Sequence, residues 1–200
     1  MNTDALLDAL RAMSGWELAA VLLGIAYLVL AVRESLWCWY AAFVSTAIFL
    51  YLFWQVGLLM ESALQVYYLV MAVYGWWQWQ HGSGGSDELE ISRWRPSRHL
   101  LAVGLVVLVS GGSGWLLAAH TDAALPYLDS FTTWGSILTT WMVARKVLEN
   151  WLYWLVIDSV SIYLYLDREL YLTALLFMVY LVIVLFGYRK WLQHYRMQNA

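Results

Sequence analysis

The sequence predicts an all-α membrane protein with seven transmembrane helices, arranged as two parallel three-helix repeats joined by a linking helix. Three observations lead to this fold class. The chain is 62% hydrophobic and only 12% charged, whereas soluble domains carry about 25% charged residues. Its apolar residues form runs that are long enough to cross a bilayer. The second half of the chain also repeats the pattern of the first half.

The repeat has a fixed offset of 112 residues and needs no gap. Internal duplications in apolar chains are typical of transporters. Chance similarity between aromatic-rich segments is the alternative, but the register extends over both apolar and charged positions. The aligned pairs are Glu17 and Asp129, Arg33 and Arg145, Trp39 and Trp151, Tyr51 and Tyr163, Leu58 and Leu170, Tyr68 and Tyr180, Gly75 and Gly187, and Trp79 and Trp191.

A membrane-spanning helix needs about 20 mostly apolar residues. Seven runs fit this length, at about 16–32, 36–55, 61–80, 99–119, 127–146, 150–166 and 170–192. We therefore expect a first three-helix repeat over 16–80, a linking helix over 99–119, a second repeat over 127–192 and a tail over 193–200. Residues 1–15 suggest an interfacial amphipathic segment. The Gly-rich, charged stretch 81–98 is expected to be a solvated loop.

The basic residues predict the orientation of the chain in the membrane. Because the fifth span follows four others, it enters the membrane in the same sense as the first span, which makes the repeats parallel. Nine of the 11 Lys and Arg residues fall on one side, and only Arg11 and Arg168 fall on the other. The excess of positive charge in cytoplasmic loops therefore places the N-terminus outside and the C-terminus, the 81–98 loop and the 193–200 tail in the cytoplasm.

Polar residues lie on one face of the fifth span. Asp129, Thr133, Ser136 and Thr140 follow a spacing of four, three and four residues, which places them on one side of a helix. Such side chains in a span usually face a cavity or another helix. The alternative is that the hydroxyl groups bond back to their own helix. We favour Thr133 and Ser136 as part of a substrate cavity.

The sixth span begins with the run Asn150-Trp151-Leu152-Tyr153-Trp154 and contains Asp158. Trp151, Trp154 and Asp158 share one helical face, and Ser161 and Tyr165 continue it. Two indoles one turn apart suit the stacking of a planar or cationic ring. A carboxylate within a span is costly unless it meets water, a donor or a cation. We assign all three residues and Asn150 to a substrate site; for the tryptophans, an interfacial aromatic belt is the alternative.

The third span contributes weaker candidates. Gln65 and Tyr68 lie on one face, and a buried Gln offers two donors and one acceptor. An interhelical hydrogen bond would explain Gln65 equally well. In the seventh span, Tyr180 could approach the same cavity, but we favour core packing for it. We expect the tryptophans between residues 76 and 79 to belong mostly to an aromatic belt. With one cysteine and scattered histidines, we expect no metal site and no cofactor.

These residues together resemble the PnuC family of vitamin transporters. The resemblance covers the whole chain and rests on the seven-span layout, on the stretches 35–39, 65–68 and 74–77, and above all on the motif Trp151-x-x-Trp154-x-x-x-Asp158. It implies a SWEET-like arrangement of three, one and three helices, a possible trimeric assembly, and a substrate site at Trp151, Trp154 and Asp158, with Gln65 and Tyr68 as further candidates.

The resemblance also implies a function. We expect facilitated diffusion of nicotinamide riboside across the bacterial inner membrane, followed by phosphorylation by a cytoplasmic kinase that makes no stable contact. Nicotinamide riboside carriers have Asn where this chain has Asp158, so thiamine is an alternative substrate, and riboflavin is a substrate of other relatives. No nucleic-acid partner is expected. A membrane scaffold, or a membrane-embedded enzyme that uses Asp158, are the alternatives from other functional classes, although no second catalytic group accompanies Asp158 at a fixed spacing.

Overall fold

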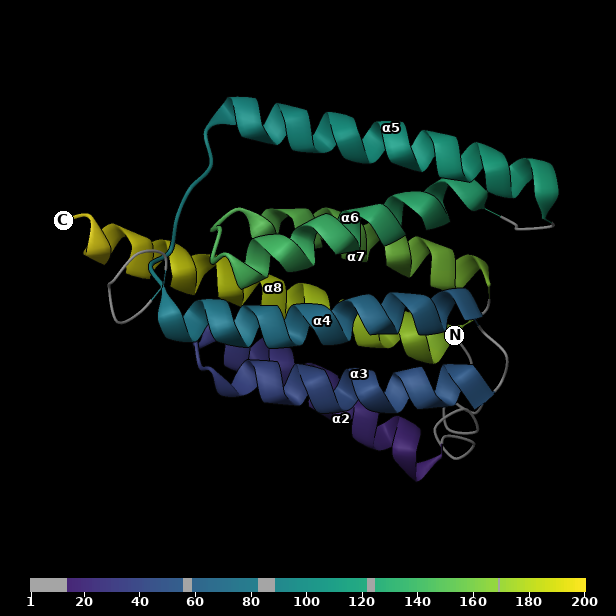
Figure 1. The fold of residues 1–200 in the computed structure, drawn as a ribbon, viewed down its shortest axis with the longest axis horizontal. Coiled ribbons are helices and arrows are strands. Elements are labelled where there is room, and N and C mark those ends of the chain that lie inside the picture. The colour runs from purple at the N-terminus through teal and green to yellow at the C-terminus, as the bar shows by residue number, and fades with distance from the viewer. Residues whose placement is uncertain (1–13, 56–58, 83–88, 122–124, 169) are drawn as a thin grey trace.

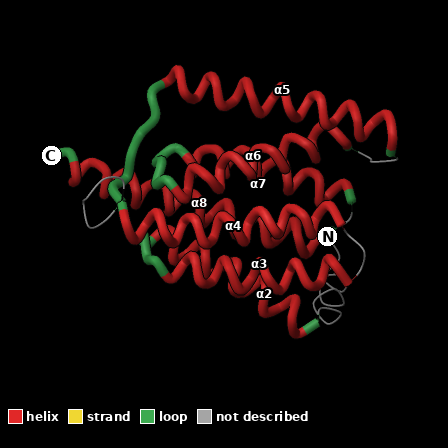
Figure 2. Tube along the Cα trace, in the orientation of Figure 1, coloured by secondary structure: helices red, strands yellow, loops and turns green. Residues whose placement is uncertain are grey.

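The computed structural model describes residues 14–55, 59–82, 89–121, 125–168 and 170–200, so the expected amphipathic segment at 1–15 lies almost wholly outside the described residues. Seven α-helices form within this part (Figure 1), and Figure 2 shows only helices and loops in it. The helices are α2 (Gly15–Val32), α3 (Trp37–Gln55), α4 (Leu59–His81), α5 (Pro96–His120), α6 (Pro126–Ala144), α7 (Asn150–Asp167) and α8 (Tyr171–Gln198).

Each of the seven expected spans corresponds to one of these helices. Helix α5 begins three residues earlier than expected, at Pro96, because proline is well suited to the first position of a helix. Helix α8 continues to Gln198, through most of the expected tail. By length and hydropathy, α2, α3, α5 and α8 are apolar enough to cross a membrane, whereas α4, α6 and α7 carry more polar residues.

We describe the helices in two groups that follow the two halves of the sequence, α2 to α4 and α6 to α8. Within the first group α2 packs on α3 and α3 on α4; within the second, α6 packs on α7 and α7 on α8. The groups meet where α2 contacts α8 and where α4 contacts α6. Helix α5 packs against α6 and lies along the outside of the molecule (Figure 1). The first helix of each group therefore contacts the third helix of the other.

The best-buried part of the core lies at one end of the molecule, where α2, α4, α6 and α8 end. We call this the basic end, because Arg33 follows the end of α2, Lys146 follows the end of α6, and the Arg-containing segment leads from the end of α4 to α5. Four buried indoles form its tryptophan cluster: Trp39, Trp79, Trp151 and Trp191. Ring centroids lie 5.3 Å apart in the Trp39–Trp79 pair and in the Trp151–Trp191 pair, both edge to face, and 6.1 Å apart between Trp79 and Trp191.

Two expectations for the basic end need correction. Trp79 is only 3% exposed and belongs to the core, not to an aromatic belt, whereas Trp77 is half exposed. The stretch before α5 is also not fully solvated, since Leu89 and Ile91 are buried in the core. Both differences have the same cause. A local polar pattern predicts that these side chains are at the surface, but packing against distant segments buries them.

The segment before α5 is held against the turn between α6 and α7. Ser92 donates from its backbone N–H to the carbonyl of Lys146 at 3.0 Å, and Leu148 donates to the carbonyl of Ser92 at 2.8 Å. The Glu149 carboxylate accepts a 2.8 Å bond from Arg93 and a 3.3 Å bond from the Trp94 backbone. These bonds satisfy backbone groups that would otherwise be buried without partners.

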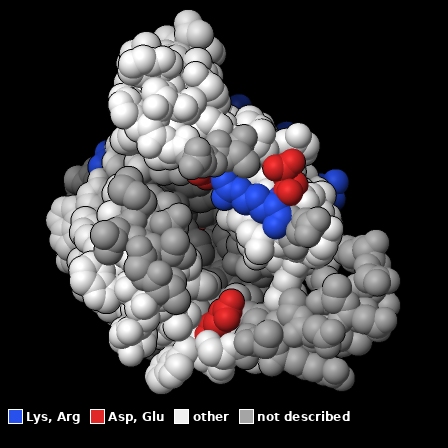
Figure 3. Space-filling model, turned by 90° about the vertical axis from the view of Figure 1, so that its right-hand side faces the viewer, with Lys and Arg blue, Asp and Glu red and all other residues white. Residues whose placement is uncertain are grey.

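The opposite end of the molecule is open. Figure 3 shows this face, with a hollow in its middle and charged side chains around the margin. One of the ion pairs at this end joins Arg168 and Asp129 at 3.8 Å, and both side chains are more than a third exposed. The fold therefore combines a closed, tryptophan-filled basic end with a hollowed opposite end.

Candidate functional site

Asp158 is a buried carboxylate within α7. It is 3% exposed and lies one turn beyond Trp154, near the middle of the helix. Within the described part of the chain, no Lys, Arg or His forms an ion pair with it, and no side chain donates a hydrogen bond to it. Because an uncompensated carboxylate is costly in a low-dielectric interior, this position is a strong candidate for contact with a ligand.

Two tyrosine side chains lie within electrostatic reach of Asp158. They are Tyr165, on α7, and Tyr180, on α8. Tyr180 also approaches α2, since a Cβ at Gly24 would lie 3.1 Å from its hydroxyl oxygen. Gly24 therefore leaves room for the Tyr180 hydroxyl against α2.

Tyr68 extends this polar region to the other group of helices. Its hydroxyl lies near the side chain of Ser136, on α6, and within electrostatic reach of Tyr165. We refer to Tyr68, Ser136, Asp158, Tyr165 and Tyr180 as the aspartate–tyrosine cluster. The cluster draws on both groups of helices, so a ligand bound there would contact both.

The structure separates the two tryptophans of the motif. Trp151 is 1% exposed and belongs to the tryptophan cluster, where its ring lies against Gly187. Trp154 is partly buried and packs against the edge of the same core. The two indoles therefore do not present equivalent faces in this conformation, and Trp154 is the one with surface left for a ligand.

Asn150 and Trp151 carry buried polar atoms without partners. Asn150 is fully buried and donates a 2.7 Å bond to the carbonyl of Val147, but its own side-chain oxygen has no donor. The indole N–H of Trp151 likewise has no acceptor among the described residues. Such atoms are rare in native interiors, and they mark the start of α7 as a place where a ligand, a water or another conformation would supply the missing bonds.

The remaining predicted residues have different surroundings. The Thr140 hydroxyl donates a 2.8 Å hydrogen bond to the carbonyl of Ser136. This is the bonding of a hydroxyl to its own helix that was the alternative to a cavity lining. Gln65 and Thr133 are partly buried, and neither makes a hydrogen bond within the described part of the chain. The structure thus brings Tyr68, Ser136 and Asp158 into one cluster, while no contact ties Gln65 or Thr133 to it.

The sequence favoured core packing for Tyr180 over an approach to the cavity, and in the structure its hydroxyl lies within electrostatic reach of Asp158. A tyrosine in a span gives no local signal that distinguishes a packing role from a polar one. The position of Tyr180 relative to Gly187 could have indicated its role. Both residues lie on one face of α8, and Gly187 marks that face as the one that meets α7.

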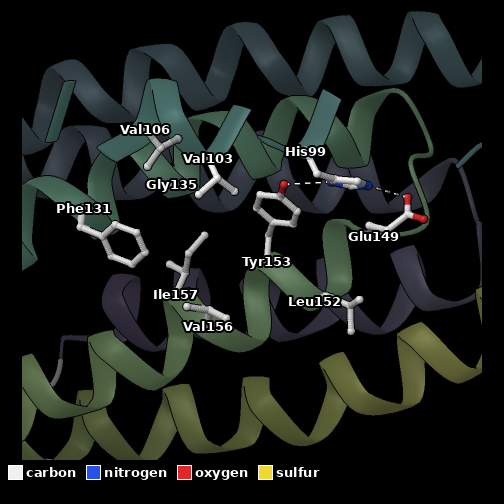
Figure 4. Close-up of a pocket in the computed structure, with 10 residues that line it drawn as sticks. All are labelled: His99, Val103, Val106, Phe131, Gly135, Glu149, Leu152, Tyr153, Val156 and Ile157. Atoms are coloured by element: carbon white, nitrogen blue, oxygen red, sulfur yellow. Dashed lines mark hydrogen bonds and ion pairs between the residues drawn. The ribbon is translucent and has the colours of Figure 1, made fainter. Parts of the chain in front are cut away.

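A separate cavity of about 410 Å³ lies between α5 and the second group of helices (Figure 4). Its walls are almost wholly apolar, and it contains none of the predicted site residues. Only its end at His99 is polar, where the His99 Nδ1 lies 3.0 Å from the Tyr153 hydroxyl and the Nε2 lies 3.9 Å from Glu149 (Figure 4). Its position and lining distinguish it from the aspartate–tyrosine cluster.

Known proteins resemble this chain over most of its length. The riboflavin/roseoflavin transporter RibM of Streptomyces davaonensis is 28% identical over 181 residues, which are 88% of this chain and 83% of that protein. The nicotinamide riboside transporter PnuC of Escherichia coli is 23% identical over 214 residues, with 94% of this chain and 89% of that protein covered.

A solved structure has the same fold. The crystal structure of the vitamin B3 transporter PnuC superposes with a TM-score of 0.76 at 20% identity, covering 96% of this chain and 87% of that chain. The family model described as nicotinamide mononucleotide transporter matches residues 14–193. All seven helices of the structure begin within this range. The chain therefore belongs to the nicotinamide mononucleotide transporter family, to which the nicotinamide riboside transporter PnuC is related.

Proposed function

We propose that this protein carries a small cationic aromatic vitamin, nicotinamide riboside, across the bacterial inner membrane by facilitated diffusion. Membership of a transporter family supports the general function. The substrate class rests on one observation, which is the buried Asp158 carboxylate without a counter-charge among the residues that the structure describes. The N-terminus lies outside the cell and the C-terminus in the cytoplasm.

A cation in the site supplies the charge that the protein does not. Nicotinamide riboside carries a positive ring and several hydroxyl groups. When the ring lies near Asp158, the buried carboxylate gains a counter-charge, and the desolvation cost of both charges is shared. We expect the hydroxyls of Tyr165 and Tyr180, which lie within electrostatic reach of Asp158, to bond with the ribose. Thiamine is also cationic and aromatic, so it remains the alternative substrate.

Trp154 supplies the aromatic contact in this proposal. Its partly buried ring lies one turn from Asp158 on the same helix, so a flat cation that reaches the carboxylate also meets the indole. Trp151 instead positions α7, because its ring is enclosed by Gly187 and Trp191. Asn150, Gln65 and Thr133 become contacts only if the helices shift during the transport cycle.

Two pseudo-equivalent repeats provide the movement. The pairing of α2 with α8 and of α4 with α6 is what a two-fold relation between the repeats requires. In carriers built from such repeats, one bundle rocks against the other and exposes a central site to each side in turn. The aspartate–tyrosine cluster lies between the bundles, where this movement would transfer the substrate. A trimeric assembly, and a kinase that phosphorylates the substrate in the cytoplasm, complete the proposal.

Uptake into liposomes tests the proposal. Purified protein in liposomes without any ion gradient should take up labelled nicotinamide riboside until the inside and outside concentrations are equal. Strict dependence on a proton or sodium gradient would contradict facilitated diffusion. A lack of saturable uptake of nicotinamide riboside, thiamine and riboflavin alike would favour a scaffold or an enzyme.

A further inference from the structure

A buried ion pair joins the two groups of helices at the basic end. The Lys146 ammonium lies 3.0 Å from the Glu34 carboxylate, and the two side chains are 7% and 12% exposed. Glu34 follows α2 and Lys146 follows α6, so each belongs to the turn after the first helix of its group. The two residues are 112 positions apart, which is the offset of the internal repeat.

The two turns share an unusual backbone conformation. Glu34 has a φ of 55° and Lys146 a φ of 46°, and no other residue except glycine has a positive φ in the described part of the chain. Left-handed backbone is unfavourable for residues with a Cβ. The same conformation at two equivalent positions directs one acidic and one basic side chain toward each other across the boundary between the groups.

Each turn is also held by an indole from the other group. Trp79, on α4, donates a 3.2 Å bond to the carbonyl of Val143, and Trp191, on α8, donates a 3.1 Å bond to the carbonyl of Ala31. These carbonyls lie three residues before Lys146 and Glu34 respectively. The contacts are thus reciprocal, and both hold a turn in place from the third helix of the opposite group.

Further contacts complete the surroundings of the pair. The other oxygen of Glu34 lies 2.6 Å from the Nδ1 of His194, on α8. The Lys146 ammonium lies 4.9 Å from the centroid of the Trp79 ring, within the range of a cation–π contact. Cys38 lies within electrostatic reach of Lys146 and is fully buried.

We propose that Glu34 and Lys146 form the gate of the basic end, and that the transport cycle requires this pair to separate. The inference rests on the alternating-access function proposed above. The structure has its basic end closed by the pair and its opposite end hollowed (Figure 3), so it is the state in which the gate is shut. Opening the basic end moves α2 away from α8 and α6 away from α4, which pulls Glu34 from Lys146.

An ion pair suits a contact that must form and break in every cycle. A buried pair recovers in Coulomb attraction much of what it loses in hydration, so its net contribution to the closed state is modest. When the gate opens, water solvates both charges again. An apolar contact of similar size would expose hydrophobic surface instead, which is costly each time. The pair thus closes the end without locking it.

Cys38 provides a native reporter of the gate, because it is the only cysteine of the chain and lies buried within electrostatic reach of Lys146. With the gate shut, it is protected from N-ethylmaleimide. Removing the charge by Glu34→Gln should accelerate its alkylation about 5-fold or more, since the open state becomes more populated. Glu90→Gln, at an exposed position of the same end, is the matched control and should leave the rate unchanged.

Charge reversal tests whether the two residues act as a pair. Glu34→Lys and Lys146→Glu should each accelerate the alkylation of Cys38. The double variant restores opposite charges, so it should react more slowly than either single variant. If its rate equals or exceeds that of the faster single variant, the pair is not the gate.

A second reporter distinguishes gating from a loosened fold. In a Cys38→Ser background, Glu17→Cys places a thiol at the partly exposed end of α2, on the hollowed side. If the two ends open alternately, Glu34→Gln should slow the alkylation of this thiol while that of Cys38 accelerates. The proposal is overturned if both thiols become more reactive together, or if Cys38 stays as protected as in the parent. None of these measurements uses a substrate, so a wrong vitamin assignment would not affect them.

Discussion

Gly187 lies so close to the face of Trp151 that a Cβ added to it would stand 2.7 Å from three carbon atoms of the indole. Gly75 has the same relationship to Trp39. Gly187→Ala should therefore overpack the core and lower the free energy of unfolding by about 1–3 kcal/mol. Thermal melting of the purified protein in detergent measures this as a lower Tm.

Gly104→Ala is the matched control for that substitution. Gly104 lies in α5, and a Cβ there would meet no atom within 4 Å. Alanine also favours the helical conformation over glycine by up to about 1 kcal/mol. The control should keep or raise the Tm. A Gly187→Ala variant as stable as this control would contradict the close packing of Trp151.

The two reciprocal indole hydrogen bonds should contribute equally to the free energy of unfolding. Trp191→Phe and Trp79→Phe keep most of the ring but remove the N–H group that bonds to Ala31 or Val143. Each variant should lose about 1–2 kcal/mol, because a buried carbonyl loses its donor. Melting curves of both variants check this, with Trp77→Phe, at a half-exposed position, as the control. A Tm equal to that of the control would count against the reciprocal contacts.

The carboxylate of Glu149 should be important for holding the segment before α5. It is almost wholly buried and accepts bonds from Arg93 and from the Trp94 backbone. Glu149→Gln removes the negative charge and leaves Arg93 without its partner, so limited proteolysis should cleave this segment several-fold faster. Glu90→Gln, at an exposed position of the same segment, should be cleaved at the parent rate. Equal rates for the two variants would show that Glu149 does not hold the segment.

The sequence allowed the helices and their order to be predicted, because apolar runs of the required length are local features. It also indicated Asp158, since a carboxylate within an apolar span is rare and costly. It did not indicate the pairing of Glu34 with Lys146 or the burial of Leu89 and Ile91, because these depend on contacts between distant segments. Trp151 shows the same limit, since its spacing fits both a ligand face and a core face.

Asp158 should be required for transport of a cationic substrate. Asp158→Asn keeps the size of the side chain but removes its charge. Because the resemblance gives nicotinamide riboside carriers Asn at this position, the variant tests whether this chain depends on the charge itself. We expect that it does, so the half-saturating concentration of nicotinamide riboside should rise by roughly 30-fold, equivalent to about 2 kcal/mol. Asp167→Asn, at the exposed end of the same helix, is the matched control. Uptake into liposomes is compared for the parent protein and the two variants. If Asp158→Asn has the same saturation curve as the control, Asp158 does not bind the substrate.

Binding of three vitamins to the purified protein, measured side by side by titration calorimetry, tests the central claim most directly. If Asp158 selects a cation, nicotinamide riboside binds saturably, Asp158→Asn weakens this binding by at least about 10-fold, and neutral riboflavin binds weakly to both proteins. Tighter binding of thiamine than of nicotinamide riboside would favour the alternative substrate. Tight binding of riboflavin that is insensitive to Asp158→Asn would contradict the account.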